Sequence, residues 1–250
     1  MKSYVPFVAG NIEIRLTANE EELNETKRLR YNELLLSYNK DAVNETGMLS
    51  DEYDEQADHL IAIDLKINKI IGTYRFLRKD QLKPGQIFAS EEEFDITPIK
   101  HENILEIGRA VVSKEYRTGS TIMLLLKGLM NCAYAHKIKY IFGTVSFLGI
   151  NPLKYSHAFS YIYYNHLSPE AVRVKAIAGE GVALNRYAKH EIDYSVVKKE
   201  MPALVKGYIN VGSTFGGEAF VDRSFNSVDL FVLAEVDKIS DKYINRFVKN

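Results

Sequence analysis

The sequence predicts one mixed α/β domain, because short apolar segments typical of strands alternate with segments whose apolar residues recur at helical spacing. The chain has 250 residues, of which 46% are hydrophobic and 26% are charged, the proportions of an ordinary globular protein. No internal repeat and no proline-rich linker divides it. We therefore expect a single domain over residues 1–250 that folds without a disulfide or a metal ion.

The first part of the chain predicts a strand, a helix and a hairpin. Residues 11–17 alternate like a strand, and residues 20–37 carry apolar residues at helical spacing. Residues 38–58 are polar and acidic, and we expect a loop long enough to have a function. A short turn over residues 66–69 separates HLIAIDL from IIGTYRFL, and this pattern predicts a hairpin of two strands.

The second part of the chain predicts further strands and helices. Residues 104–112 have the pattern of a buried strand that Glu106 and Arg109 interrupt, and residues 120–136 that of an apolar helix. The later expected elements are a strand at YIFGTVSF, a tyrosine-rich helix opened by Pro152, a strand at AVRVKAI, a loosely structured polar stretch, a helix from Pro202 through Val211, a last strand at SVDLFVLAEV and a short helix from Asp237.

Charge is distributed unevenly, although the formal net charge is only −1. Residues 11–58 hold 13 acidic and 5 basic residues, whereas residues 108–210 hold 14 basic and 6 acidic residues. A net charge near zero gives no overall attraction to nucleic acid, which we exclude as a partner. The two biased segments indicate either faces for oppositely charged partners or two solvated faces without a partner.

Cysteine use and hydropathy limit where the protein works. Cys132 is the single cysteine, and its apolar helical surroundings favour a core role over that of a nucleophile. No segment approaches the roughly 18 apolar residues of a membrane span, and the N-terminus lacks the apolar core of a signal peptide. We predict a cytoplasmic protein, with membrane contact limited to peripheral association at the inner face. Residues 155–164 favour core packing, and an interfacial face is the alternative.

Eight segments, in their order along the chain, carry a resemblance to a known family. They are DEYDEQADHL, IGTYRFL, SEEEFDI, LEIGRAVV, GTVSFLGINP, NHLSP, LVKGYINVG and VDRSFNSVD. The chain resembles the GNAT superfamily and, within it, the hemolysin-like branch of bacterial L-ornithine N-alpha-acyltransferases, which are related to autoinducer synthases. The resemblance implies a strongly twisted, mixed central sheet flanked by helices, with a family-specific C-terminal part over about residues 166–250.

The turn before the predicted apolar helix is the expected donor site. Arg117 and Gly119 precede a helix that begins near Ser120, and the unpaired N–H groups of a helix N-terminus bind phosphate. The usual GNAT turn places its glycine three residues after the first arginine or glutamine, but here Gly119 follows Arg117 by two. This departure favours an acyl carrier protein, whose phosphopantetheine thioester carries a single phosphate, over coenzyme A. No separate cofactor is expected. The donor site would also include Val111, whose neighbouring backbone N–H stabilises the oxyanion, and Val112.

Glu106 and Arg109 are the expected catalytic residues. Amide formation needs a neutral amine, and a carboxylate in an apolar strand can act as the base because desolvation raises its pKa. The autoinducer synthases, which this chain resembles, share a Glu-x-x-Arg at this strand. The alternative is a structural ion pair between the two residues. On a regular strand they would face opposite ways, so either interpretation requires a bulge near Gly108.

Other charged residues predict how the substrate is held. Arg75 could bind the substrate carboxylate as a bidentate partner, or be an ordinary surface arginine. Asp51 and Asp54 could bind the δ-ammonium of ornithine, or belong to a solvated loop. A third polar group, which could equally cap a turn, consists of Asp222, Arg223 and Asn226.

The histidines do not predict a metal site, because none has metal-ligand spacing. The spacing of His59 and Asp64 is similar to that of glycerophosphate acyltransferases, but five residues apart on a strand the two side chains face opposite ways. His166 lies within the NHLSP segment and is a further residue that could line the site.

Taken with the resemblance, these observations predict an N-acyltransferase that moves a (3-hydroxy)acyl chain from acyl carrier protein to the α-amine of ornithine and so forms a lyso-ornithine lipid. One alternative keeps the chemistry and changes the acceptor to glycine or another amino acid. Another is a non-catalytic module that binds carrier protein or membrane. An acyl-homoserine lactone synthase is disfavoured, because the chain extends past the usual length of that family and contains LVKGYINVG and VDRSFNSVD.

Overall fold

The computed structural model describes residues 5–117 and 120–239, and the chain divides into two compact units. The first unit contains the described residues up to Gly85 together with Leu105–Ile138. The second contains Gln86–Ile104 and the described residues from Lys139 onward. The single domain over residues 1–250 stays a prediction.

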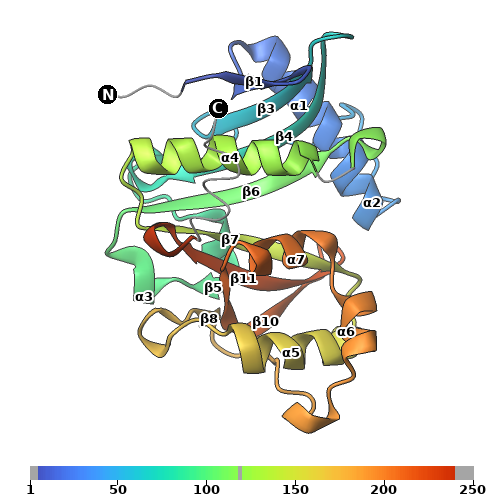
Figure 1. Cartoon of the computed structure of the whole chain (residues 1–250), viewed down its shortest axis with the longest axis vertical. Coiled ribbons are helices and arrows are strands. Elements are labelled where there is room, and N and C mark those ends of the chain that lie inside the picture. The colour runs from blue at the N-terminus through green and yellow to red at the C-terminus, as the bar shows by residue number, and fades with distance from the viewer. Residues whose placement is uncertain (1–4, 118–119, 240–250) are drawn as a thin grey trace. The chain divides into compact units, whose positions relative to one another are not determined.

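The first unit is an antiparallel sheet with helices packed against it (Figure 1). Its strands follow the order β1 (Phe7–Ala9), β2 (Ile12–Leu16), β3 (Asp58–Asp64), β4 (Lys69–Arg78) and β6 (Ile104–Val112). Its helices are α1 (Glu20–Arg30), α2 (Leu36–Tyr38) and α4 (Ser120–Ala135). The predicted hairpin and the predicted strand over residues 104–112 are both confirmed.

Helices α1 and α4 cover opposite faces of this sheet. On one face Leu29 of α1 packs against the buried cluster of Ile61, Ile63 and Ile70. On the other face a Cβ atom added at Gly72 would lie 3.2 Å from the side chain of Leu125 of α4, so helix and strand approach closely at this glycine. Because side chains alternate along a strand, residues of β4 that face away from α4 face the α1 side.

Helix α1 begins where the sequence predicts and then changes its winding. The Asn19 side chain accepts a hydrogen bond from the Glu22 N–H and caps the N-terminus. Beyond Arg30 the chain continues as a π-helical turn over Tyr31–Leu35 before α2. Such turns are rare and occur frequently at functional sites.

The second unit has a four-stranded antiparallel sheet and a separate pair of short strands. The sheet order is β7 (Tyr140–Leu148), β11 (Ser227–Glu235), β10 (Thr214–Asp222) and β9 (Val182–Ala183), and the pair is β5 (Phe94–Asp95) with β8 (Lys175–Ala176). The helices are α3 (Thr97–Lys100), α5 (Ser156–His166), α6 (Tyr194–Glu200) and α7 (Ala203–Asn210).

Aromatic side chains form much of the core of the second unit. Phe142 of β7 stacks on Phe231 of β11, with ring centroids 5.6 Å apart. Phe88 contacts the first ring edge-on at 5.1 Å, and Phe94 contacts the second at 5.6 Å. All four rings are buried, so this cluster fixes the segment before β5 against the sheet.

The α/β fold class is confirmed, and so are most of the predicted elements, but the strand at AVRVKAI is largely wrong. Only Lys175–Ala176 is a strand there, because a 3₁₀ turn over Glu170–Val172 follows Pro169. The sequence analysis also missed α6 and β10. The glycines of β10 weaken its strand pattern, but a Cβ at Gly216 would lie 2.9 Å from the Val174 carbonyl oxygen.

Within the described residues, no helix has both the length and the apolarity needed to cross a membrane.

We expect Phe231→Ala to destabilise the protein by about 3–5 kcal/mol, because it opens a cavity between two packed rings. Urea unfolding followed by circular dichroism measures this. Leu153→Ala, at a side chain that is 64% exposed, should cost less than about 0.5 kcal/mol. Equal losses for the two variants would contradict the packing described above.

Candidate active site

A cluster of charged side chains lies on the α1 side of the sheet in the first unit. Strand register places Arg75 of β4 directly opposite His59 of β3 and Gly108 of β6. Residues opposite each other in an antiparallel pair project from the same face. Asp51 and Asp54, from the segment before β3, reach Arg75 on this face.

The cluster is a chain of ion pairs. Asp54 accepts hydrogen bonds from Arg30 of α1 at 2.6 Å and from Arg75 at 2.9 Å. Asp51 pairs with Arg75 and, through its other oxygen, with Arg109 of β6 at 2.9 Å. The first pair is almost completely buried, with Arg30 0% and Asp54 1% exposed. Removing one partner from a buried pair costs far more than removing a surface pair, because the other charge stays buried.

Both carboxylates of the cluster are ionised. Burial opposes the ionisation of Asp54, but the guanidinium groups of Arg30 and Arg75 outweigh it and hold the pKa of that carboxyl well below its usual range. Asp51 behaves in the same way, since Arg75 and Arg109 lower its pKa against the effect of burial. Three guanidinium groups therefore face two carboxylates.

His59 is neutral and joins two members of the cluster. Its Nδ1 lies 2.5 Å from an Arg30 guanidinium nitrogen, and its Nε2 lies 2.8 Å from the Asp54 carbonyl oxygen. Because Arg30 can only donate, Nδ1 is the acceptor and Nε2 carries the proton. Burial, together with the charge of Arg30, lowers the pKa of His59 to about 4.

A β-bulge turns Arg109 toward the cluster, as the sequence analysis required. Thr73 pairs with Val111 and Arg75 with Gly108, so two residues of β6 stand opposite Tyr74 alone. Arg109 occupies one of these positions with φ of 54°, a left-handed conformation that non-glycine residues rarely adopt. The distortion brings its guanidinium to Asp51.

Glu106 lies on the same face as Arg75. Glu106 of β6 pairs with Leu77 of β4, so it lies diagonally opposite Arg75 on the neighbouring strand. Its side chain is nearly buried, with 7% of the residue exposed. The bulge thus lets the side chains of Glu106 and Arg109 project from the same face of the sheet, although on a regular strand they would project from opposite faces. Their catalytic roles stay predictions.

The residues of the predicted donor turn are tied to the π-helical turn after α1. The Arg117 Nε donates to the Val112 carbonyl at 2.9 Å, and another of its nitrogens pairs with Glu33 at 2.7 Å. Ser120 is exposed at the start of α4, whereas Gly119 lies outside the described residues. Val111 is buried and pairs with β4. The donor-binding roles of these residues stay predictions.

The third predicted group lies in the second unit, at the turn between β10 and β11. Asp222 Oδ1 accepts hydrogen bonds from the N–H groups of Ser224 and Phe225 at 2.7 and 2.9 Å. Asn226 has φ of 58°, which fits this tight turn, and Arg223 is exposed. The turn-capping interpretation is therefore confirmed for Asp222, while a substrate role for the group stays a prediction.

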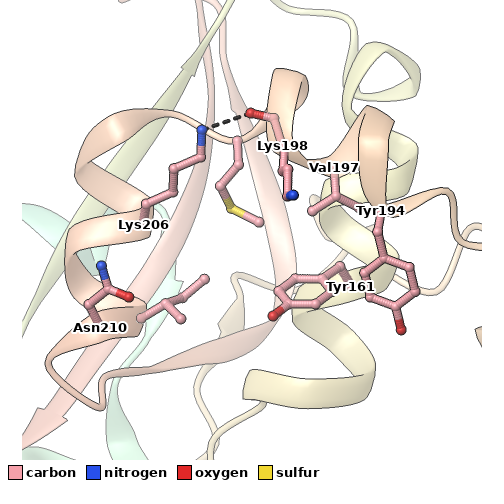
Figure 2. Close-up of a pocket in the computed structure, with 8 residues that line it drawn as sticks. Tyr161, Tyr194, Val197, Lys198, Lys206 and Asn210 are labelled. Carbon is pink, nitrogen blue, oxygen red and sulfur yellow. Dashed lines mark hydrogen bonds between the residues drawn. The ribbon is translucent and has the colours of Figure 1, made fainter.

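A pocket of about 270 Å³ also lies in the second unit, beside α5, α6 and α7. Figure 2 shows Tyr161 and Tyr194 next to each other on one side of it, and Lys206 reaching across to donate to the Lys198 carbonyl at 2.7 Å. None of the predicted site residues lines this pocket. It therefore does not support a choice among the predicted roles.

Cys132 has the buried surroundings that the sequence favours, whereas a site-lining role for His166 stays a prediction. Cys132 is buried in α4, and burial raises the pKa of its thiol to about 12, which excludes a reactive thiolate near neutral pH. His166 ends α5 partly buried against the ring of Tyr161.

Arg30 was not predicted as a member of the cluster, and His59 was not predicted as a site residue. A signal existed for Arg30, which occupies a position of the apolar helical pattern over residues 20–37. A charged residue at such a position predicts either a break in the core or a buried partner. No sequence signal links His59 to Arg30, because the contact depends on the packing of α1 against β3.

Comparisons with known proteins agree with this fold. Residues 29–127 match the acetyltransferase (GNAT) domain family. Three bacterial relatives are each named L-ornithine N(alpha)-acyltransferase. The protein of Rhodobacter capsulatus is 31% identical, and the match covers 92% of each chain. The protein of Agrobacterium fabrum is 32% identical, with 95% of this chain and 85% of its own covered, and that of Brucella abortus is 29% identical, with 96% of this chain and 92% of its own covered.

Solved structures show the same fold at low identity. The acyl-homoserine lactone synthase MesI, described as CoA-dependent, superposes with a TM-score of 0.53 at 15% identity, covering 95% of this chain and 96% of its own. FeeM, an N-acyl amino acid synthase from uncultured soil microbes, superposes with a TM-score of 0.52 at 11% identity, covering 93% of each chain.

We expect the contribution of His59 to stability to fall as the pH drops from about 6.5 to 4, because over this range the unfolded chain binds a proton at His59 that the folded protein does not bind. One such group contributes a slope of at most about 1.4 kcal/mol per pH unit. His59→Asn stays neutral and should flatten the slope over this window in urea unfolding. The exposed His101→Asn variant is the control and should keep the wild-type slope. Identical slopes in all three proteins would refute the neutral, buried state of His59.

Proposed function

The chain belongs to the family of L-ornithine N(alpha)-acyltransferases, and from this premise we propose that it transfers a (3-hydroxy)acyl chain from acyl carrier protein to the α-amine of L-ornithine, forming lyso-ornithine lipid. The observation that carries the proposal is the identity to named relatives over nearly the whole chain. The charged face around Arg75 and Glu106 supplies residues suited to an amino-acid substrate. Association with the inner face of the membrane stays a prediction.

The reaction joins the substrate nitrogen to the acyl carbon and breaks the thioester. The α-ammonium loses a proton to Glu106 or to a water molecule that it holds, and the resulting amine attacks the thioester carbonyl. A backbone N–H near Val111 stabilises the oxyanion of the tetrahedral intermediate. Collapse of this intermediate expels the phosphopantetheine thiolate, which takes up the proton that the substrate nitrogen loses as the amide forms and leaves as the thiol.

The charge of the cluster supports a role in holding an amino acid. Its three guanidinium groups and two carboxylates carry one excess positive charge while His59 is neutral. Arg75 is the predicted partner of the α-carboxylate. Asp51 is 22% exposed at its side chain and is the more accessible of the two acids, which suits contact with a δ-ammonium.

The sequence of the turn before α4 and the distribution of basic residues both support acyl carrier protein as the donor. A carrier-bound phosphopantetheine has one phosphate, and acyl carrier proteins are acidic, so the excess of basic residues over residues 108–210 is complementary to such a donor in charge. Arg117 is half-exposed beside the N-terminus of α4, where it can meet such a phosphate. The CoA-dependent synthases share only the fold with this chain at 12–15% identity, so they do not decide the donor.

We expect the purified protein to form N-acylornithine from 3-hydroxyacyl carrier protein, as followed by mass spectrometry. Glu106→Gln should lower kcat by about 10²- to 10⁴-fold, because the glutamine cannot accept the proton. The exposed Glu45→Gln variant is the matched control and should retain wild-type turnover.

Parallel reactions with the same acyl chain on coenzyme A, and with glycine in place of ornithine, test the donor and the acceptor. Higher kcat/KM with acyl-CoA would overturn the donor, and higher kcat/KM with glycine would overturn the acceptor. Binding of the carrier protein without turnover of any amino acid would show a non-catalytic module.

We expect Asp51→Asn to reduce the preference for ornithine over norvaline, which has the same carbon chain without the δ-ammonium. If Asp51 contacts that ammonium, the ratio of the two kcat/KM values should fall about tenfold, the size expected for one charge pair. An equal loss for both acceptors would instead show that Asp51 only positions Arg75 and Arg109.

A further inference from the structure

Three carboxylates lie close together in the second unit, and none of them belongs to the charged cluster of the first unit. Glu93 comes directly before β5, Asp222 ends β10 and Asp229 lies in β11. One oxygen atom from each of the three lies within 4.8 Å of the other two. No sequence pattern joins them, since Glu93 is more than a hundred residues from the other two.

The fold holds each carboxylate in place. Asp222 is fixed by the hydrogen bonds that its Oδ1 accepts at the turn, and its second oxygen takes no part in them. Asp229 pairs with Phe220 of β10 and Ser146 of β7 in the sheet. The aromatic contact of Phe94 with Phe231 holds the segment of Glu93 against the same sheet.

Asp229 is the member that points to a ligand. It is only 3% exposed, and its Oδ1 is buried without a hydrogen-bond partner. Among residues 5–117 and 120–239, no lysine, arginine or histidine forms an ion pair with Asp229 or Asp222. Burial raises the pKa of Asp229 to about 6, and the charge of Asp222 adds to this effect, although hydrogen bonds with Ser146, Ser227 and Glu93 oppose it.

A buried carboxylate without a cationic partner is costly, and proteins compensate it with a proton or with a bound cation. Three carboxylate groups converge on one point here, and one buried oxygen of Asp229 has no hydrogen-bond partner. A divalent cation compensates more of this negative charge than a monovalent cation does.

We propose that Glu93, Asp222 and Asp229 form a binding site for a divalent cation of the size of Ca²⁺. Calcium takes carboxylate oxygens at about 2.3–2.6 Å in irregular geometry, so oxygens up to about 5 Å apart can share one ion. Magnesium binds at about 2.0–2.1 Å in a strict octahedron and keeps its waters, which suits three fixed carboxylates less well. This inference does not depend on the acyl-transfer reaction or on its substrate.

Calorimetric titration of the metal-free full-length protein with CaCl₂ at pH 7.5 tests the site. We expect one binding event per chain, weaker binding of MgCl₂, and a rise in Tm with added calcium, since a ligand that binds only the folded state stabilises it. Calcium affinity should fall as the pH is lowered, because a carboxylate binds the ion only when it is deprotonated.

The Asp229→Asn variant should show neither a heat of calcium binding nor a calcium-dependent rise in Tm. Glu93→Gln and Asp222→Asn, at partly exposed positions, provide further tests should the first variant not fold. The exposed Asp237→Asn is the matched control and should bind calcium as the wild type does.

Three results would overturn the proposal. The first is the absence of a measurable heat of calcium binding in the wild type. The second is equal calcium affinity in the wild type and all three cluster variants, and the third is tighter binding of magnesium than of calcium. Titration with ornithine separates the remaining alternative. An ornithine-dependent rise in Tm that Asp229→Asn abolishes, in the absence of any calcium effect, would make the cluster an ammonium site.

Discussion

The arrangement of the candidate active site depends on one buried ion pair, Arg30 with Asp54. The pair joins α1 to the segment before β3, and the Leu49 N–H, which donates to the Lys27 carbonyl at 3.1 Å, joins the same two parts of the chain. Because both groups are excluded from water, each needs the other, and the free energy lost on separating them fixes the helix in its position. Arg75 and His59 then bind to this pair, and the charged face of the sheet is built outward from it.

The bulge in β6 extends this arrangement to a third strand. Without it Arg109 would project toward α4, where Leu125 and its neighbours form an apolar layer. The left-handed conformation at Arg109 costs conformational energy, which the ion pair with Asp51 offsets. Backbone irregularity and charge pairing are therefore linked here, and Glu106 lies on the face that results.

The sequence predicted the parts of this site that depend on local pattern. The apolar strand around Glu106 was recognisable because its periodicity survives the two charged residues, and the need for a bulge followed from alternation alone. His59 could not be placed in the same way, since its partner Arg30 lies 29 residues away and only tertiary packing brings them together. Strand β10 was missed for a similar reason. Its glycines lower strand propensity, and the close backbone approach at Gly216 that requires one is invisible in the sequence.

Two aspartates show how the same side chain acquires opposite properties. Asp54 and Asp229 are both almost fully buried, and burial raises the pKa of each. Two guanidinium groups reverse that effect at Asp54, so its charge is satisfied within the protein and serves to position other residues. Asp229 has carboxylates as its charged neighbours, so the protein leaves part of its charge uncompensated. Burial alone therefore does not reveal the role of a carboxylate, and the partners that the fold supplies decide whether it organises the structure or needs a cation from outside.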